Sequence, residues 1–192
     1  MPDVFEVLRQ DHDKVTAMLT RLEDGPKAWE GATGEQLAER KRLAEDLITE
    51  SSRHEAAEQR YFWPAFRATG PLGDRVADLA ADQEQVGEQV LHGLVKLGPA
   101  EERFEELLAE FTALTRAHIE FEEQQAWPLL RAVLSAEQAA ELGDKIIATE
   151  QPAPTRPNPV IPPDEDAVKA ASPVAGLADR LRDLVTGRGR RS

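Results

Sequence analysis

The chain has 192 residues, of which 41% are hydrophobic and 31% charged, and its formal net charge is −13. This length supports one domain with a hydrophobic core plus a smaller appendage, and the absence of cysteine excludes disulfides, iron–sulfur clusters and thiolate-ligated metals. Residues 151–192 hold seven Lys and Arg against five Asp and Glu, so residues 1–150 carry a charge of −15. Such a charge disfavours binding to nucleic acid or anionic lipid. Because the sequence has no bilayer-spanning apolar run and no signal-peptide pattern at its N-terminus, we expect a cytoplasmic protein.

Four long segments carry apolar residues at helical spacing, and no window alternates with the two-residue period of a strand. Glycine and proline separate these segments at residues 25–34, 69–71 and 98–99. Four amphipathic helices of this length predict an all-α, antiparallel four-helix bundle over residues 1–134. The core stripe predicted for the third helix consists of Val76, Leu79, Val86, Val90, Leu94 and Leu97.

Shorter elements are predicted after the bundle. An additional helix is expected over residues 135–150, because Ser135 and Gln138 form a capping-box pattern at its start. Residues 151–172 are rich in proline and predict an extended linker. Residues 173–188 predict an amphipathic C-terminal helix that docks on the bundle or binds a protein partner, and its short apolar stripe makes membrane contact the weaker alternative.

Each of the four predicted helices places polar side chains on its apolar stripe. The second and fourth helices each carry a His-x-x-x-Glu pair, whose two side chains point the same way because four residues make little more than one helical turn. A buried carboxylate or imidazole needs a compensating partner, and the stripes contain no Lys or Arg. Imidazole together with carboxylate suits a redox-capable divalent metal, so we predict a metal site rather than a purely structural hydrogen-bond network. The predicted ligands are His12, His54, Glu58, His118 and Glu122.

The order of these residues, with Trp-Pro following each pair at 63–64 and 127–128, resembles the hemerythrin-like HHE cation-binding domain over about residues 3–134. The Pro-rich segment and the terminal residues 179–183 resemble extensions of actinobacterial members. The resemblance implies a bundle that holds two irons bridged by the two carboxylates of the pairs. Iron is therefore the expected metal, and manganese is the alternative.

The sequence departs from the family pattern at Gln83, where the third helix is expected to supply a histidine. Three consequences are open: one iron has a free position, Glu84 or Tyr61 substitutes, or the second metal binds weakly. Tyr61 shares a helical face with His54 and Glu58. It is thus a candidate ferric ligand, a hydrogen-bonding neighbour of the ligands or a packing residue.

Two further residues complicate the ligand assignment. Oxygen-carrying hemerythrins resemble this chain but separate histidine and carboxylate by five residues, and Glu123 satisfies that spacing. The helical angle favours Glu122, because it reproduces the arrangement of Glu58. The fourth histidine, His92, lies about a quarter turn off the face of Gln83 and is predicted at the surface. The two tryptophans are expected to pack over the site.

The resemblance implies that dioxygen, peroxide or nitric oxide binds at such a centre. The first functional prediction is a non-haem di-iron protein that binds or reacts with dioxygen or peroxide, and the sequence leaves open whether it is an enzyme. The alternative is an iron- or redox-responsive interaction module whose C-terminal tail contacts a partner. A metal-free helical scaffold is the third possibility.

Overall fold

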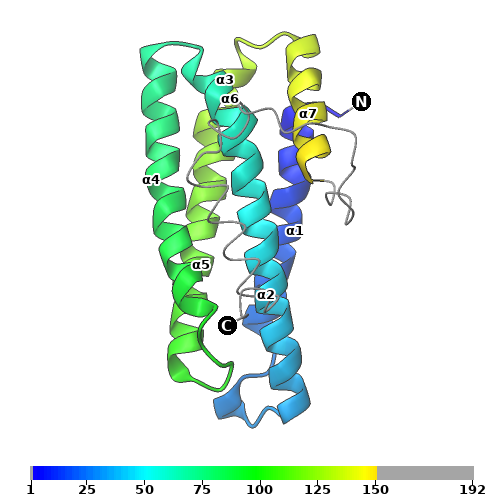
Figure 1. Ribbon diagram of the computed structural model, residues 1–192, viewed down its shortest axis with the longest axis vertical. Coiled ribbons are helices and arrows are strands. Elements are labelled where there is room, and N and C mark those ends of the chain that lie inside the picture. The colour runs from blue at the N-terminus through cyan, green and yellow to red at the C-terminus, as the bar shows by residue number, and fades with distance from the viewer. Residues whose placement is uncertain (1, 151–192) are drawn as a thin grey trace, which may run out of the picture.

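The computed structural model describes residues 2–150. Its four long helices lie side by side as a bundle, and helices that follow one another in the sequence run in opposite directions (Figure 1). They are α1 (Val4–Asp24), α2 (Gly34–Ala57), α4 (Pro71–Leu94) and α5 (Glu102–Phe121). Because residues 2–150 contain no strand, the predicted all-α antiparallel bundle is confirmed. The predicted Pro-rich linker, the C-terminal helix and its predicted partner contact lie outside the described residues.

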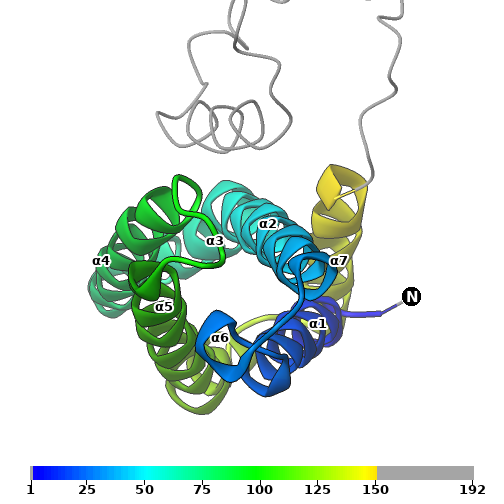
Figure 2. The ribbon, with the colours of Figure 1, turned by 90° about the horizontal axis from the view of Figure 1, so that it is seen from below.

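Seen along its long axis, the bundle is a ring in which α1 packs against α2 and α5, and α4 packs against α5 and α2 (Figure 2). The shorter elements lie at its ends or its side. They are the 3₁₀ turn η1 (Ala28–Glu30), α3 (Trp63–Arg67), α6 (Trp127–Arg131) and α7 (Ala136–Glu150). The last of these, α7, packs against α1 and α2. Within the described residues, no helix combines the length and the apolar character needed to cross a membrane.

Three helices begin at capping boxes. In a capping box the residue before the helix and the third helical residue each accept, through the side chain, a hydrogen bond from the backbone amide of the other. In α1 the Asp3 carboxylate accepts from the Glu6 amide at 2.9 Å, and the Glu6 carboxylate accepts from the Asp3 amide at 3.0 Å. Equivalent boxes start α2 and α7, formed by Thr33 with Gln36 and by Ser135 with Gln138. The box predicted for the helix that follows the bundle is therefore present.

The second and fourth bundle helices are each interrupted by a π turn, where the sequence pattern predicted continuous helix. These turns are η2 (Glu58–Phe62) and η3 (Glu122–Ala126). In each, the amide of the following tryptophan donates to the carbonyl five residues back, at Glu58 and Glu122. The Trp-Pro pairs account for the position of the turns: in a regular α-helix the proline ring would collide with the carbonyl four residues earlier, and the wider π turn relieves that collision.

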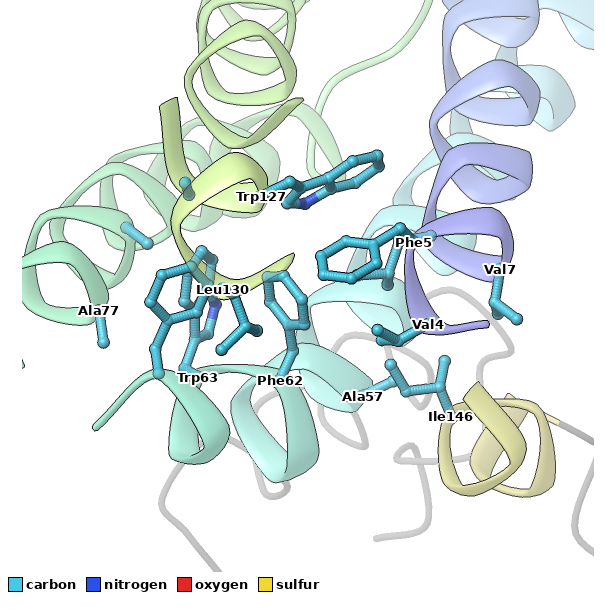
Figure 3. Packing of buried hydrophobic residues seen from close by; sticks show 14 of the residues in the cluster. Val4, Phe5, Val7, Ala57, Phe62, Trp63, Ala77, Trp127, Leu130 and Ile146 are labelled. Carbon is cyan, nitrogen blue, oxygen red and sulfur yellow. The ribbon is translucent and has the colours of Figure 1, made fainter. Parts of the chain in front are cut away.

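The hydrophobic core consists of two clusters. One lies at the Trp-Pro end of the bundle and is rich in aromatic rings, with Phe5, Phe62, Trp63 and Trp127 among its buried members (Figure 3). The other fills the opposite half of the bundle. Its buried residues include Val15, Leu19, Leu47, Leu91, Phe104 and Phe111. A layer of buried histidine and glutamate side chains lies between the two clusters.

The buried face of α4 differs from the predicted one. Leu79 and Val86 were expected in the core, yet they are 47% and 45% exposed. Small residues and one carboxylate take their place, because alanine and glycine allow neighbouring helices to approach closely. The buried residues of α4 are Gly73, Ala77, Ala80, Glu84, Gly87, Val90, Leu91 and Leu94. The stripe is thus displaced by one residue, which brings Glu84 into the interior.

Candidate metal centre

The five residues predicted as metal ligands converge at one level of the bundle. His12 comes from α1, His54 from the last turn of α2 and His118 from the last turn of α5. Glu58 and Glu122 are the first residues of the two π turns, and both are fully buried. The π turns therefore begin at the carboxylates themselves, and π turns in proteins occur frequently at functional sites.

The Nε2 atoms of the three histidines face the two carboxylates. Glu122 lies between two of them, with one oxygen 2.9 Å from His12 Nε2 and the other 3.3 Å from His118 Nε2. A Glu58 oxygen lies 3.4 Å from His54 Nε2. A carboxylate whose two oxygens face histidines of different helices is arranged like a ligand that bridges two metals.

Potential ligand atoms form two overlapping groups, and within each group all atoms lie within 4.8 Å of one another. The first group contains His12, His54, Glu58 and Glu122, and the second contains Glu58, Glu84 and His118. Glu58 belongs to both groups. The geometry accordingly suits two neighbouring cations that share a carboxylate.

Glu84 is the residue that the predicted ligand set omitted. It is 3% exposed, and its carboxylate accepts hydrogen bonds from Trp63 Nε1 at 2.7 Å and from Gln59 Nε2 at 2.5 Å. Small residues recur every seven positions on the buried face of α4, and Glu84 lies on this face with Ala80 and Gly87. This recurrence is the feature of the sequence that marks Glu84 as buried. Among the substitutes considered for the missing histidine, Glu84 is the one that the structure brings to the centre.

Gln83 lies on the outer side of His118 and does not join the carboxylates. Its Oε1 accepts a hydrogen bond from His118 Nδ1 at 2.9 Å. Glu123 occupies the corresponding place at His12, with an oxygen 3.0 Å from Nδ1, and Asp11 Oδ2 lies 3.6 Å from His54 Nδ1. Each histidine presents Nε2 inward, and His12 and His118 make the outer hydrogen bond through Nδ1 that metal-binding histidines almost always make. At His54 the carboxylate of Asp11 lies on the Nδ1 side but beyond hydrogen-bond distance.

The remaining candidates lie away from the inward-facing atoms. The half-buried ring of Tyr61 packs against the aromatic cluster, with the Arg60 guanidinium 5.3 Å from its centroid. His92 is exposed, as predicted. Trp127 stacks on His12 with 5.2 Å between ring centroids, and its partner at the other π turn hydrogen-bonds Glu84. The tryptophans therefore cover the centre from the Trp-Pro end.

Burial and mutual repulsion govern the ionisation of the carboxylates. Burial, together with the charges of Glu122 and Glu84, raises the pKa of Glu58 well above its usual value. Burial also raises the pKa of Glu84 to about 7, although Gln59, His118 and Trp63 oppose this shift. Burial disfavours ionisation of Glu122 as well, but the neighbouring His118 and His12 hold its pKa below the usual range.

The histidines divide in the same way. Burial lowers the pKa of His12 and His118, but contact with Glu122 outweighs it, so that both pKa values are raised. Burial prevails at His54 and lowers its pKa. Without a metal, the buried carboxylates are thus compensated by protons and by the histidines next to Glu122. A divalent cation would take the place of these protons.

The residues present fit a metal on a second ground. Both carboxyl oxygens of Glu58 are buried without a hydrogen-bond partner among the described residues. Unsatisfied buried carboxylates are costly, and metal coordination is one of the few arrangements that compensates them. The donor set of imidazole nitrogens and carboxylate oxygens suits iron or manganese.

A cavity of about 30 Å³ adjoins the centre. His12, His54, Glu84 and His118 form the part of its wall next to the centre, and further lining residues lie toward the middle of the bundle. They include Val15, Ser51, Glu55, Gly87, Phe111 and Leu114. A cavity of this size has room for a water or a molecule of a few atoms.

Comparison with known proteins places this site in a family. The family model of the hemerythrin HHE cation-binding domain matches residues 3–130. In fold, the chain is similar to the crystal structure of a hemerythrin HHE cation-binding domain-containing protein from Mycobacterium kansasii, with a TM-score of 0.64 and 22% sequence identity over 78% of this chain and 86% of the other. No curated protein sequence matches the chain significantly. The family match spans all four bundle helices and every residue of the histidine and carboxylate layer, and the chain belongs to the hemerythrin HHE cation-binding domain family.

Proposed function

We propose that this chain is a non-haem di-iron protein that binds or reacts with dioxygen or peroxide at a carboxylate-bridged centre in the bundle. The observation that carries the proposal is the position of Glu58, which belongs to both ligand groups and whose two buried oxygens have no hydrogen-bond partner within residues 2–150. Two irons would supply the electrons and the open coordination positions that such chemistry requires.

The proposed ligands divide unequally between the two metal positions. One position would take two imidazoles, from His12 and His54, and the other would take His118 and the carboxylate of Glu84. Glu58 and Glu122 would be shared, because the oxygens of Glu122 face histidines on both sides. An anionic, hard ligand in place of imidazole favours the higher oxidation state of the second metal. We therefore favour reaction over reversible carriage.

The protein groups around the centre have distinct tasks in this proposal. Gln83 and Glu123 fix the orientation of His118 and His12 through hydrogen bonds with Nδ1. The tryptophans and the aromatic cluster close one side to water. The cavity on the other side leaves a place for a small molecule such as dioxygen, peroxide or nitric oxide.

Metal analysis of the purified protein tests this proposal. We expect close to two irons per chain in the wild type and a large loss of metal in His54→Ala. His92→Ala is the matched control, because it removes an exposed histidine remote from the centre and should leave the metal content unchanged. Full metal content in His54→Ala would contradict the proposed site, and manganese in place of iron would contradict the proposed metal.

A further inference from the structure

The cavity beside the centre contains a hydroxyl group without a visible purpose in the fold. Ser51 is 5% exposed and lines the cavity, and its Oγ has no hydrogen-bond partner among the described residues. A buried hydroxyl without a partner costs about 1–3 kcal/mol. An apolar residue at this position would avoid that cost.

Several other helical hydroxyls among the described residues are satisfied by their own helix. Thr112 donates to the Leu108 carbonyl at 2.8 Å, and Thr49 donates to the Glu45 carbonyl at 3.0 Å. This bond to the carbonyl four residues back is the usual solution for serine and threonine inside helices. Ser51 does not make it, so its donor remains available to a molecule in the cavity.

Ser51 is also placed within reach of the metal centre. It precedes His54 by three residues on α2, and side chains at this spacing are neighbours with Cβ atoms about 5–6 Å apart. His54 and Ser51 line the same cavity. A ligand of two or three atoms that extends from the metals into the cavity would share this space with the hydroxyl.

Gly87 on α4 keeps part of this space open. A Cβ atom built there would lie 3.8 Å from Phe111 Cε2, an ordinary van der Waals contact, so the site can hold a methyl group without collision. Glycine within a helix is unfavourable relative to alanine. The chain thus retains a residue that weakens α4 where an alanine would fit and would narrow the cavity.

We propose that the Ser51 hydroxyl donates a hydrogen bond to the free end of a small ligand held at the metal centre, in space that Gly87 leaves open. This inference rests on the proposed function. It defines the ligand class as molecules of two or three atoms whose far end accepts a hydrogen bond, such as dioxygen, peroxide, nitric oxide or the probe azide. Carbon monoxide, whose far end is a poor acceptor, should gain little from Ser51.

Azide binding to the iron-loaded, oxidised protein provides the first test, with the absorption of the azide adduct as the readout. We expect Ser51→Ala to weaken azide binding about 10- to 100-fold, the value of one hydrogen bond to a charged ligand. Ser52→Ala is the matched control, because Ser52 is the next residue of the same helix and does not line the cavity. Gly87→Ala should also weaken azide binding while raising the unfolding temperature, which separates loss of space from loss of folding.

Nitric oxide on the reduced protein provides the second test, by infrared spectroscopy. A hydrogen bond from Ser51 predicts that the N–O stretch shifts between H2O and D2O in the wild type and in Ser52→Ala, and that this shift disappears in Ser51→Ala. Equal azide affinity and an equal isotope shift in Ser51→Ala and the wild type would overturn the inference and leave the proposed function intact. Failure of the iron-loaded wild type to bind either probe would overturn both.

Discussion

Replacing Glu84 by glutamine should have opposite effects on the metal-free and the metal-loaded protein. Burial raises the pKa of Glu84 from 4.5 to about 7. In the metal-free protein the unfolded chain therefore releases this proton first as pH rises, and stability falls between about pH 4.5 and 7. Each pKa unit corresponds to about 1.4 kcal/mol. Above pH 7 the ionisation of Glu84 therefore lowers the free energy of unfolding by about 3 kcal/mol.

Two of the histidines act in the same direction as Glu84. The raised pKa values of His12 and His118 mean that their stabilising contribution is present below pH 6.5 and is lost as pH rises through their folded-state values. The lowered pKa of His54 acts oppositely, because its contribution is lost as pH falls below 6.5. The carboxylates outweigh this single residue, so the chelator-treated wild type should be more stable at pH 5 than at pH 8.

Chemical denaturation of the chelator-treated protein at pH 5, 6, 7 and 8 measures this dependence. Glu84→Gln keeps an oxygen that can accept the hydrogen bond from Trp63 but cannot ionise. It should therefore be about 3 kcal/mol more stable than the wild type at pH 8 and show a shallower pH dependence. The exposed Glu120→Gln is the control. Wild-type stability that stays level or rises from pH 5 to 8, or a Glu84→Gln variant no more stable than the wild type at pH 8, would refute the reasoning.

The metal-loaded protein should respond in the other direction. Here Glu84 is proposed as a ligand, and metal binding requires its deprotonated form, so metal affinity should increase with pH. Glu84→Gln should bind close to one metal per chain where the wild type binds two. The same substitution would then stabilise the metal-free protein and weaken the loaded one, a combination that loss of folding cannot produce.

Two further predictions follow from contacts outside the ligand set. Gln83→Ala should weaken binding of the second metal about 10- to 100-fold in a chelator competition, because it frees His118 from its outer hydrogen bond, whereas exposed Gln89→Ala should have no effect. Arg40→Ala should lower the free energy of unfolding by about 3–5 kcal/mol in urea, because Arg40 is 4% exposed and forms a two-pronged ion pair with Glu105 at 2.6 and 2.5 Å. Arg42→Ala, which breaks only an exposed pair with Glu39, should cost less than about 1 kcal/mol, and equal losses in the two arginine variants would contradict this account.

The sequence predicted the structure best where the type of a residue and its helical spacing indicate the same role. His54 and Glu58 could be placed on one face from their spacing, and the Ser135 cap from its residue type. The buried face of α4 could not be found by counting large apolar residues, because alanine and glycine form most of it. Gln83 was therefore assigned to the interior in place of its neighbour Glu84.

The π turns could not be deduced from helical spacing, although the Trp-Pro pairs marked their position. A π turn adds one residue to the helix, so the apolar pattern beyond it is displaced relative to an α-helix. The partners behind the histidines were equally inaccessible. Asp11 neighbours His12 in sequence but faces His54, and such a pairing depends on how α1 and α2 are rotated against each other.

The layered core has a consequence for how the protein unfolds. Two hydrophobic clusters lie on either side of a polar layer. The carboxylates of this layer separate the clusters, so that apolar packing is not continuous along the bundle. Metal ions bound to residues of all four helices would fasten the two halves into one cooperative unit. Without them, the aromatic end and the opposite end could open as separate units of different stability. The metal would then determine the cooperativity of the fold as well as its chemistry.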